Sequence, residues 1–191
     1  MRHEVAKGLP LVRSELAACG FRGNTLSEMA AAGKIYRVAR GVYAPVEGGD
    51  GAYFDYELAA KAVPKGVFTL FSALRLHGLT DENPRRMTMA IPSDGHAPKV
   101  NLPLDFVYMK SELLASDVIE RNVERVGLRV FSVERTVVEC FKARNKIGVS
   151  VAVAALREAA NRRLIDFAAL GMIMKRCRMM RVMSPYVEGL A

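Results

Sequence analysis

Cysteine is scarce in this sequence, which has only Cys19, Cys140 and Cys177 among its 191 residues. The three lie far apart and form neither a CxxC nor a CxxxC pair. An odd and scattered set argues against both a disulfide framework and a structural zinc site. We therefore expect three reduced and mostly buried thiols.

Long hydrophobic runs are also missing. No apolar stretch approaches the ~20 residues that a membrane-spanning helix needs, and residues 1–8 lack the apolar segment of a secretory signal. Hydrophobic residues make up 51% of the chain and charged residues 25%, a balance typical of folded globular proteins. We expect a cytoplasmic protein without a membrane partner, folded into one or two compact domains.

Motifs that would carry catalysis are absent as well. The chain has no GxSxG, HExxH or phosphate-binding glycine loop. Asp105 and Lys110, with Asp94 upstream, come closest to a metal-dependent nuclease site, but the Glu-x-Lys pattern is missing. His77 precedes Gly78 at a predicted helix end, where a histidine can bond the last carbonyl groups, so we interpret it as structural. We predict no catalytic residue, no metal ligand and no cofactor.

Positive charge is in excess. The chain has 28 Lys and Arg against 20 Asp and Glu, which gives a formal net charge of +8 at pH 7. Such an excess favours a polyanionic partner, because basic side chains on a phosphate backbone release condensed counterions. Residues 1–46 have a net charge of +4 and residues 111–191 one of +5, while the middle is close to neutral. This distribution favours two separate basic contact regions over a positive charge spread evenly along the chain.

The N-terminal part contains two predicted helices, residues 13–19 and 24–32, each stopped by a glycine. Asn24 is a good N-cap for the second helix. The i, i+3, i+4 spacing predicts that the buried face of this helix consists of Leu26, Met29 and Ala30. Only residues 2–7 are left to form a supporting helix ahead of this pair.

A basic hairpin follows the two helices. The β-rich runs 34–38 and 42–45 are joined by Ala39-Arg40-Gly41, and glycine suits the left-handed position of such a turn. Helix, tight turn, helix and hairpin, in this order, are typical of a winged helix-turn-helix. We place this domain at residues 1–46, with a glycine-rich linker at 46–51 and a second domain at 52–191.

A winged helix-turn-helix implies double-stranded DNA as the partner, with the second helix in the major groove. The predicted base or backbone contacts near this helix are Arg22, Asn24, Thr25 and Ser27. On and before the hairpin, the residues predicted to contact phosphate or the minor groove are Lys34, Arg37 and Arg40. The alternative for each helix residue is an ordinary polar helix face.

The second domain is predicted to be mixed, so the fold class is α+β. Helices are expected at 53–63 and 68–76, followed by strands at 87–91, 104–109 and 128–131. Ser132 and Asp166 are predicted N-caps of helices at 133–144 and 167–177, with another helix at 148–161 between them. Pro185 is expected at the first position of a short last turn.

Four positive charges stand close together near the C-terminus: Lys175, Arg176, Arg178 and Arg181. A solvated helix face is the default interpretation. Methionines interleave with these cations, which also suits an adaptable surface that packs on a partner. A contact with a protein partner and a second DNA contact both remain open. For Arg135, we favour a structural ion pair over a functional role.

Three groups of motif residues follow one another along the chain. The first contains Ser14-Glu15-Leu16, Thr25-Leu26, Gly33-Lys34 and Arg40-Gly41-Val42-Tyr43. The second is Ser72-Ala73-Leu74 with His77-Gly78-Leu79, and the third runs from Val133 to Glu139 with the helix around Leu156-Arg157-Glu158-Ala159. In this order they resemble the AbiEi-type antitoxins of type IV toxin–antitoxin systems, and they span most of the chain.

This resemblance implies a cytoplasmic bacterial protein that represses its own operon by binding promoter repeats, with a homodimer on DNA as an option. It also implies antitoxin activity of the C-terminal domain against a nucleotidyltransferase-like toxin, with or without a stable complex. Two alternatives stay open. One is a winged-helix transcription factor whose second domain binds a ligand or dimerises, and the other, less favoured, is a nuclease-like enzyme.

Overall fold

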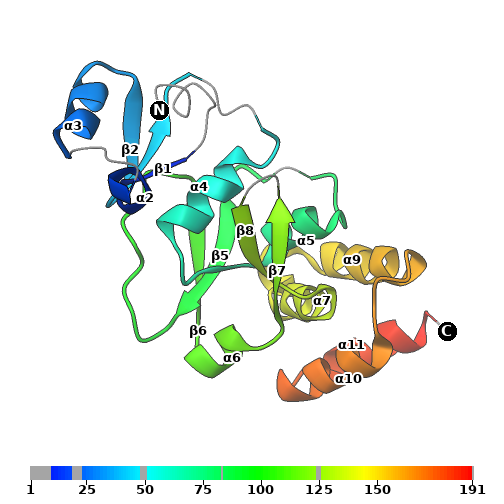
Figure 1. Cartoon of the computed structure of the whole chain (residues 1–191). Helices are drawn as coiled ribbons and strands as arrows, with labels where there is room; N and C mark the ends of the chain where they lie inside the picture. Colours follow the sequence, from blue (N-terminus) through cyan, green and yellow to red (C-terminus); the bar gives the residue numbers. More distant parts are fainter. Residues whose placement is uncertain (1–9, 19–22, 48–50, 83, 124–125, 191) are drawn as a thin grey trace.

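The structure, a computed structural model, describes residues 10–18, 23–47, 51–82, 84–123 and 126–190. Within these ranges the chain is mixed α+β, as the sequence predicted (Figure 1). The described residues form ten helices and two sheets. The predicted helix at 2–7, Cys19 and Arg22 lie outside the described residues. No described helix has the length and apolar character needed to cross a membrane.

The N-terminal sheet has three antiparallel strands in the order β1-β3-β2. They are β1 (Leu11–Val12), β2 (Ile35–Ala39) and β3 (Val42–Pro45). Between β1 and β2 the chain forms the helices α2 (Arg13–Ala18) and α3 (Gly23–Ala31). The predicted hairpin is confirmed, but its turn has two residues, because Ala39 pairs directly with Val42. The strand β1 was not predicted; it has only two residues and pairs with β3 rather than with a neighbour in sequence.

Two expectations for α3 are corrected. The helix begins at Gly23, so Asn24 lies inside it and is not its N-cap. The buried face is narrower than predicted, since Leu26 is buried, Met29 is half-buried and Ala30 is exposed. A small core of Leu11, Leu16, Leu26 and Ile35 joins the two helices to the sheet.

The central sheet has five strands in the order β6-β5-β4-β8-β7. They are β4 (Val67–Phe68), β5 (Met87–Pro92), β6 (Leu104–Met109), β7 (Val118–Val123) and β8 (Val126–Phe131). The pairs β4–β8 and β5–β6 are parallel, and the pairs β4–β5 and β7–β8 are antiparallel. The prediction of a helix from residue 68 is wrong at its start, because Phe68 belongs to β4 and the helix begins at Leu70.

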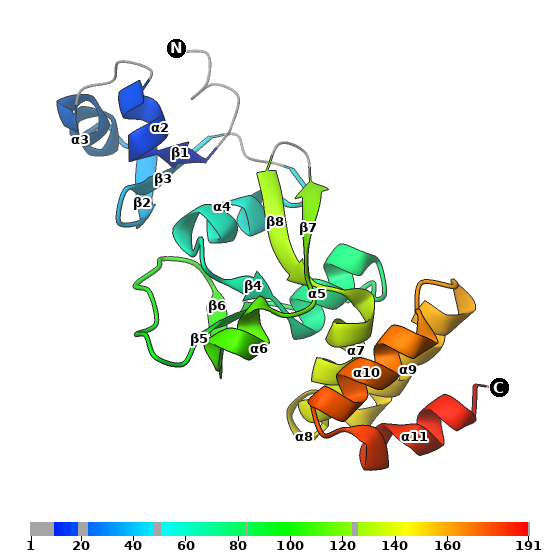
Figure 2. The same ribbon diagram turned by 60° about the horizontal axis from the view of Figure 1, so that its bottom comes forward.

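Eight helices belong to this second part of the described chain. They are α4 (Phe54–Ala62), α5 (Leu70–His77), α6 (Ser111–Ala115), α7 (Val133–Lys142), α8 (Arg144–Ile147), α9 (Val149–Asn161), α10 (Phe167–Arg176) and α11 (Met180–Glu188). Figure 2 shows α8 to α11 gathered at one end of the molecule, while the N-terminal sheet with α2 and α3 lies at the other.

The predicted helix caps at Ser132 and Asp166 are confirmed. The hydroxyl of Ser132 accepts a hydrogen bond from the Arg135 amide at 3.2 Å, and the Asp166 carboxylate accepts from the amides of Ala168 and Ala169. The expected start of a turn at Pro185 is wrong, because α11 begins at Met180 and contains this proline. The proline removes one backbone donor from the helix, but the fully buried Met183 anchors α11 to the core.

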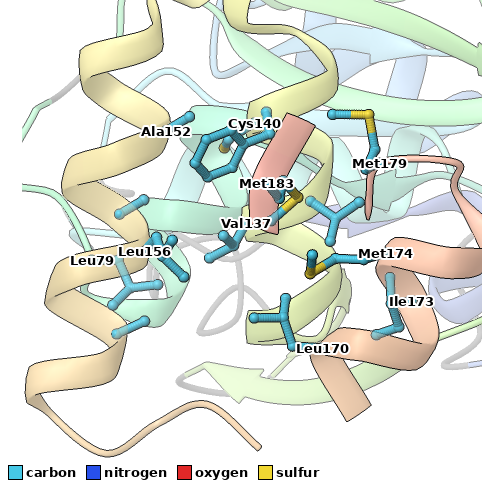
Figure 3. Packing of buried hydrophobic residues seen from close by; sticks show 14 of the residues in the cluster. Leu79, Val137, Cys140, Ala152, Leu156, Leu170, Ile173, Met174, Met179 and Met183 are labelled. Carbon is cyan, nitrogen blue, oxygen red and sulfur yellow. The ribbon is translucent and has the colours of Figure 1, made fainter. Parts of the chain in front are cut away.

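The C-terminal helices enclose the largest hydrophobic cluster (Figure 3). In this view Val137 of α7 lies between Leu156 of α9 and Leu170 of α10, and Cys140 of α7 lies toward Ala152 of α9. Burial raises the pKa of Cys140 to about 12, so this thiol stays protonated at neutral pH. Cys177 is also unpaired and is half-buried, which agrees with the expectation of reduced thiols for the two cysteines described.

The hairpin β2–β3 and the helix α4 share a hydrophobic cluster. Val38, Val42 and Ala44 of the hairpin pack with Leu58 of α4, and all four are buried. The amide of Asn101 donates a hydrogen bond to the Val38 carbonyl at 2.7 Å, which ties a loop of the second part to the hairpin. These contacts fix the position of the hairpin relative to the central sheet.

Candidate nucleic-acid interface

A groove of about 880 Å³ lies where the hairpin meets the second part of the chain. Its walls come from β2 and the following turn, from the end of α4, from the loop at 98–102 and from β6. The cationic side chains along it are Arg37, Arg40, Arg86 and Lys99, and we call this feature the basic groove. None of its lining residues is acidic.

Arg37 and Arg40 reach the basic groove because the strand β2 is irregular. The pairing of β2 with β3 shifts between Arg37 and Ala39, as in a β-bulge. Tyr36 and Arg37 are consecutive and both exposed, while Val38 and Ala39 are both buried. The Nε of Arg37 donates to the carbonyl of Ala39 at 3.2 Å, which holds its guanidinium over the turn that carries Arg40.

Arg86 is held in place at the other wall. Its Nε donates to the Asp105 carboxylate at 2.7 Å, and its Nη2 donates to the carbonyl of Leu104 at 2.7 Å. The side chains of Arg86 and Asp105 are 54% and 56% exposed, so water screens their attraction and the pair adds little stability. The pair therefore orients the guanidinium while leaving it open to a ligand.

Arg86 is paired with Asp105, but Arg37, Arg40 and Lys99 form no ion pair with a described residue, so the groove keeps an excess of positive charge that favours an anionic ligand. Arginine presents a planar fork of donors that matches phosphate oxygens, and lysine adds a mobile point charge. Such side chains are the ones that contact the phosphates of a nucleic-acid backbone. This lining is chemically suited to a polyanion.

The structure brings together only part of the predicted DNA-binding set. Arg37 and Arg40 meet in the basic groove. On α3, Asn24 and Ser27 are exposed and Thr25 is half-buried, but none of the three lines this groove. Lys34 is exposed in the turn after α3 and does not line it either. The remaining predicted contact, Arg22, lies outside the described residues.

Sequence reasoning missed Arg86 and Lys99. Both come from the middle of the chain, where the net charge is close to zero and no basic region was expected. A local signal was present, since Arg85 and Arg86 are consecutive and directly precede the strand β5. Lys99 gives no such signal, because its loop reaches the hairpin through tertiary contacts, namely the hydrogen bond from Asn101 to Val38 and the packing of Val100 and Leu102.

The four C-terminal cations are all exposed, around the junction of α10 and α11. Arg176 is engaged in an ion pair with Asp117. No ion pair is formed by Lys175, Arg178 or Arg181 with any residue that the structure describes. Met179 is buried in the core, so of the two neighbouring methionines only Met180 belongs to this surface. Met172, 67% exposed on α10, adds a further apolar contact point.

His77 and Arg135 have structural partners. The Nε2 of buried His77 donates to the Phe131 carbonyl at 2.7 Å, and burial lowers the pKa of this histidine. The fully buried guanidinium of Arg135 lies 2.8 Å from the Glu139 carboxylate and 5.0 Å from the centre of the Phe131 ring. His77 thus connects α5 to Phe131 of β8, and Arg135 connects α7 to the same phenylalanine.

The carboxylates considered for a nuclease site are spread out. Asp105 is bonded to Arg86, and Asp94 is exposed in the turn after β5. Within the described ranges, no three His, Cys, Asp or Glu side chains are grouped so that they could hold a metal ion.

Comparison of the chain with protein-family models gives no match, and a search of curated proteins gives none either.

Proposed function

We propose that this chain is a DNA-binding transcriptional autorepressor that acts as the antitoxin of a type IV toxin–antitoxin system, in abortive infection as a phage defence. The observation that carries the DNA-binding part is the basic groove, where Arg37 and Arg40 of the hairpin face Arg86 and Lys99. The ligand is the protein's own promoter DNA, and the role is binding rather than catalysis.

The N-terminal elements support a winged helix-turn-helix at residues 1–46. Two short helices are followed by a hairpin, and the strand ahead of them, β1, completes a small sheet with it. In this arrangement α3 is the helix that enters the major groove, with Asn24, Thr25 and Ser27 toward the bases and Lys34 toward the backbone. The hairpin cations then contact the neighbouring phosphates.

The antitoxin part of the proposal comes from the resemblance of the three groups of motif residues to the AbiEi-type antitoxins. Their second and third groups lie on α5, α7 and α9, in the second part of the chain. The exposed cations Lys175, Arg178 and Arg181, beside Met180, provide a surface for a nucleotidyltransferase-like toxin or a second stretch of DNA. Homodimerisation on repeated promoter sites would double the number of phosphate contacts.

DNA binding is tested by measuring the affinity for a duplex from the protein's own promoter as salt rises from about 50 mM to about 200 mM. We expect a steep loss of affinity, and Arg37→Ala with Arg40→Ala should reduce the salt slope by about one unit for each lost contact. Lys65→Ala is the matched control, because Lys65 is exposed and does not line the groove. Equal affinity for an unrelated duplex would contradict an operator-specific repressor.

Antitoxin activity is tested separately in cells. A reading frame for a nucleotidyltransferase-like protein should lie next to this gene, and its expression alone should arrest growth. Co-expression of this chain should restore growth, and Arg37→Ala with Arg40→Ala should leave that rescue intact when both genes are under an external promoter. The antitoxin assignment fails if the neighbour is absent and no rescue is seen, whatever the DNA result.

A further inference from the structure

A second pocket, of about 350 Å³, lies between the start of α5, the end of β6 and the end of α7. Its volume is within the range of small-molecule sites. It shares no lining residue with the basic groove, so a ligand could occupy it whether or not the groove binds DNA. We call it the α7 pocket, and its polar lining side chains come from Thr69, Tyr108, Glu139, Lys142, Asn145 and Lys146.

The α7 pocket contains a buried hydroxyl group, that of Thr69, without a hydrogen-bond partner among the residues described. Thr69 is the N-cap of α5, a position where a threonine side chain usually accepts a bond from the first turn. Here its side chain makes no such cap bond, and its buried oxygen has no hydrogen-bond partner among the residues described. A buried hydroxyl without a partner destabilises a protein, so a ligand that bonds it would recover that loss.

The backbone next to Thr69 is strained. Leu70 has a φ of +50°, in the left-handed region that leucine rarely adopts. Its side chain also lines the pocket. Strained backbone of this kind persists only where surrounding structure enforces it, and it is found preferentially at ligand sites.

The charges around the pocket are asymmetric. Glu139, the one acidic lining residue, already forms ion pairs with Arg135 at 2.8 Å and with Lys142 at 2.9 Å. Lys146 is exposed and makes no ion pair within the described ranges, so the pocket has an uncompensated positive charge. The remaining wall is apolar, from Leu70, Val107 and Met109.

We propose that the α7 pocket binds a small organic anion, whose charged group is held by Lys142, Lys146 and the Thr69 hydroxyl. Its apolar body packs on Leu70 and Val107. A carboxylate and a phosphate monoester share this chemistry, because each offers several acceptor oxygens to the two ammonium groups and the hydroxyl donor.

The probes are benzoate and phenyl phosphate, with benzamide as the uncharged counterpart, added to the full chain in calorimetric titrations. We expect saturable binding of at least one anion with a dissociation constant of about 1 mM, and no binding of benzamide. The two anions distinguish a carboxylate site from a phosphate site. Equal binding of benzamide, or no binding of either anion at about 10 mM, would overturn the proposal.

Variants locate the binding. Thr69→Val removes the hydroxyl without changing the shape, so the free protein should melt no lower than wild type while anion binding weakens about tenfold. Thr69→Ser, which keeps the hydroxyl, should bind like wild type. Lys146→Ala should weaken binding by a similar factor, and exposed Lys65→Ala should not change it. Binding unaffected by both Thr69→Val and Lys146→Ala, or a lower melting temperature for Thr69→Val, would contradict the assigned site.

Discussion

The guanidinium of Arg135 lies 2.8 Å from the carboxylate of Glu139, one turn further along α7, and the two side chains are 0% and 5% exposed. Arg135 also faces Asp117 at 3.4 Å, and Asp117 in turn pairs with Arg176 of α10. This chain of charges joins α7, the central sheet and the C-terminal helices. Arg135 and Glu139 of α7 therefore have a structural role.

Glu139→Gln should destabilise the protein by about 3 kcal/mol, because it leaves a buried guanidinium without its main counter-charge. Urea unfolding measures this loss. The double variant Arg135→Met with Glu139→Leu should lose less than the sum of the two single changes, since an apolar pair needs no charge compensation. Additive losses would mean that the two side chains do not act as a pair.

His77 should make stability depend on pH. Burial lowers its pKa in the folded chain, whereas the unfolded chain titrates near 6.5. Below about pH 6.5 the unfolded state binds more protons, so the free energy of unfolding falls as pH falls toward the folded pKa. His77→Gln, which can still donate to the Phe131 carbonyl, should show a smaller loss between about pH 7.5 and about pH 5.5. His96→Gln, at an exposed position, should follow wild type.

Arg86→Ala and Lys99→Ala should each weaken DNA binding and lower its salt slope by about one unit, although both lie outside the predicted DNA-binding domain. Anisotropy of a labelled promoter duplex gives the slope. The effect should be equal for specific and unrelated duplexes, because phosphate contacts read no sequence. If only substitutions of Arg37 and Arg40 change the affinity and its salt slope, DNA does not occupy the whole groove.

Gly41→Ala should destabilise the hairpin by about 1 kcal/mol, because Gly41 has a φ of +78°. The cost is conformational, since the new methyl group would meet the Arg13 Cβ at an ordinary 3.8 Å. Gly95→Ala is the control, at a turn glycine without positive φ where the nearest contact is 3.9 Å. Equal melting temperatures for the two variants would contradict a strained turn.

Elements with local signals could be predicted from the sequence. The helix after Ser132 and the one after Asp166 both begin with a side chain that bonds their first amides. The hairpin turn depends on Gly41, whose signal is also local. The helix α3 was predicted close to its observed position. Its start was misplaced because asparagine is a favoured N-cap, whereas the helix begins at Gly23, one residue before Asn24.

Elements that depend on distant partners could not be predicted. The two-residue strand β4 exists because β5 and β8 bond it from both sides. The edge strand β7 has mostly exposed residues, including Glu120 and Arg121, so its pattern lacks the alternation of a half-buried strand. The basic groove depends on the same kind of distant contact, since Arg37 and Lys99 are far apart in sequence.

The packing of Val38, Val42 and Ala44 on Leu58 has a consequence for how the protein comes apart. A fragment ending at the hairpin would carry an apolar face that α4 and the loop residues Val100 and Leu102 now cover. Such a fragment would be prone to self-association, and in the whole chain the hairpin and α4 should melt in a single transition. If the proposed function holds, a proteolytic cut between them would remove promoter binding along with the stability of both pieces, and cleavage would relieve repression irreversibly.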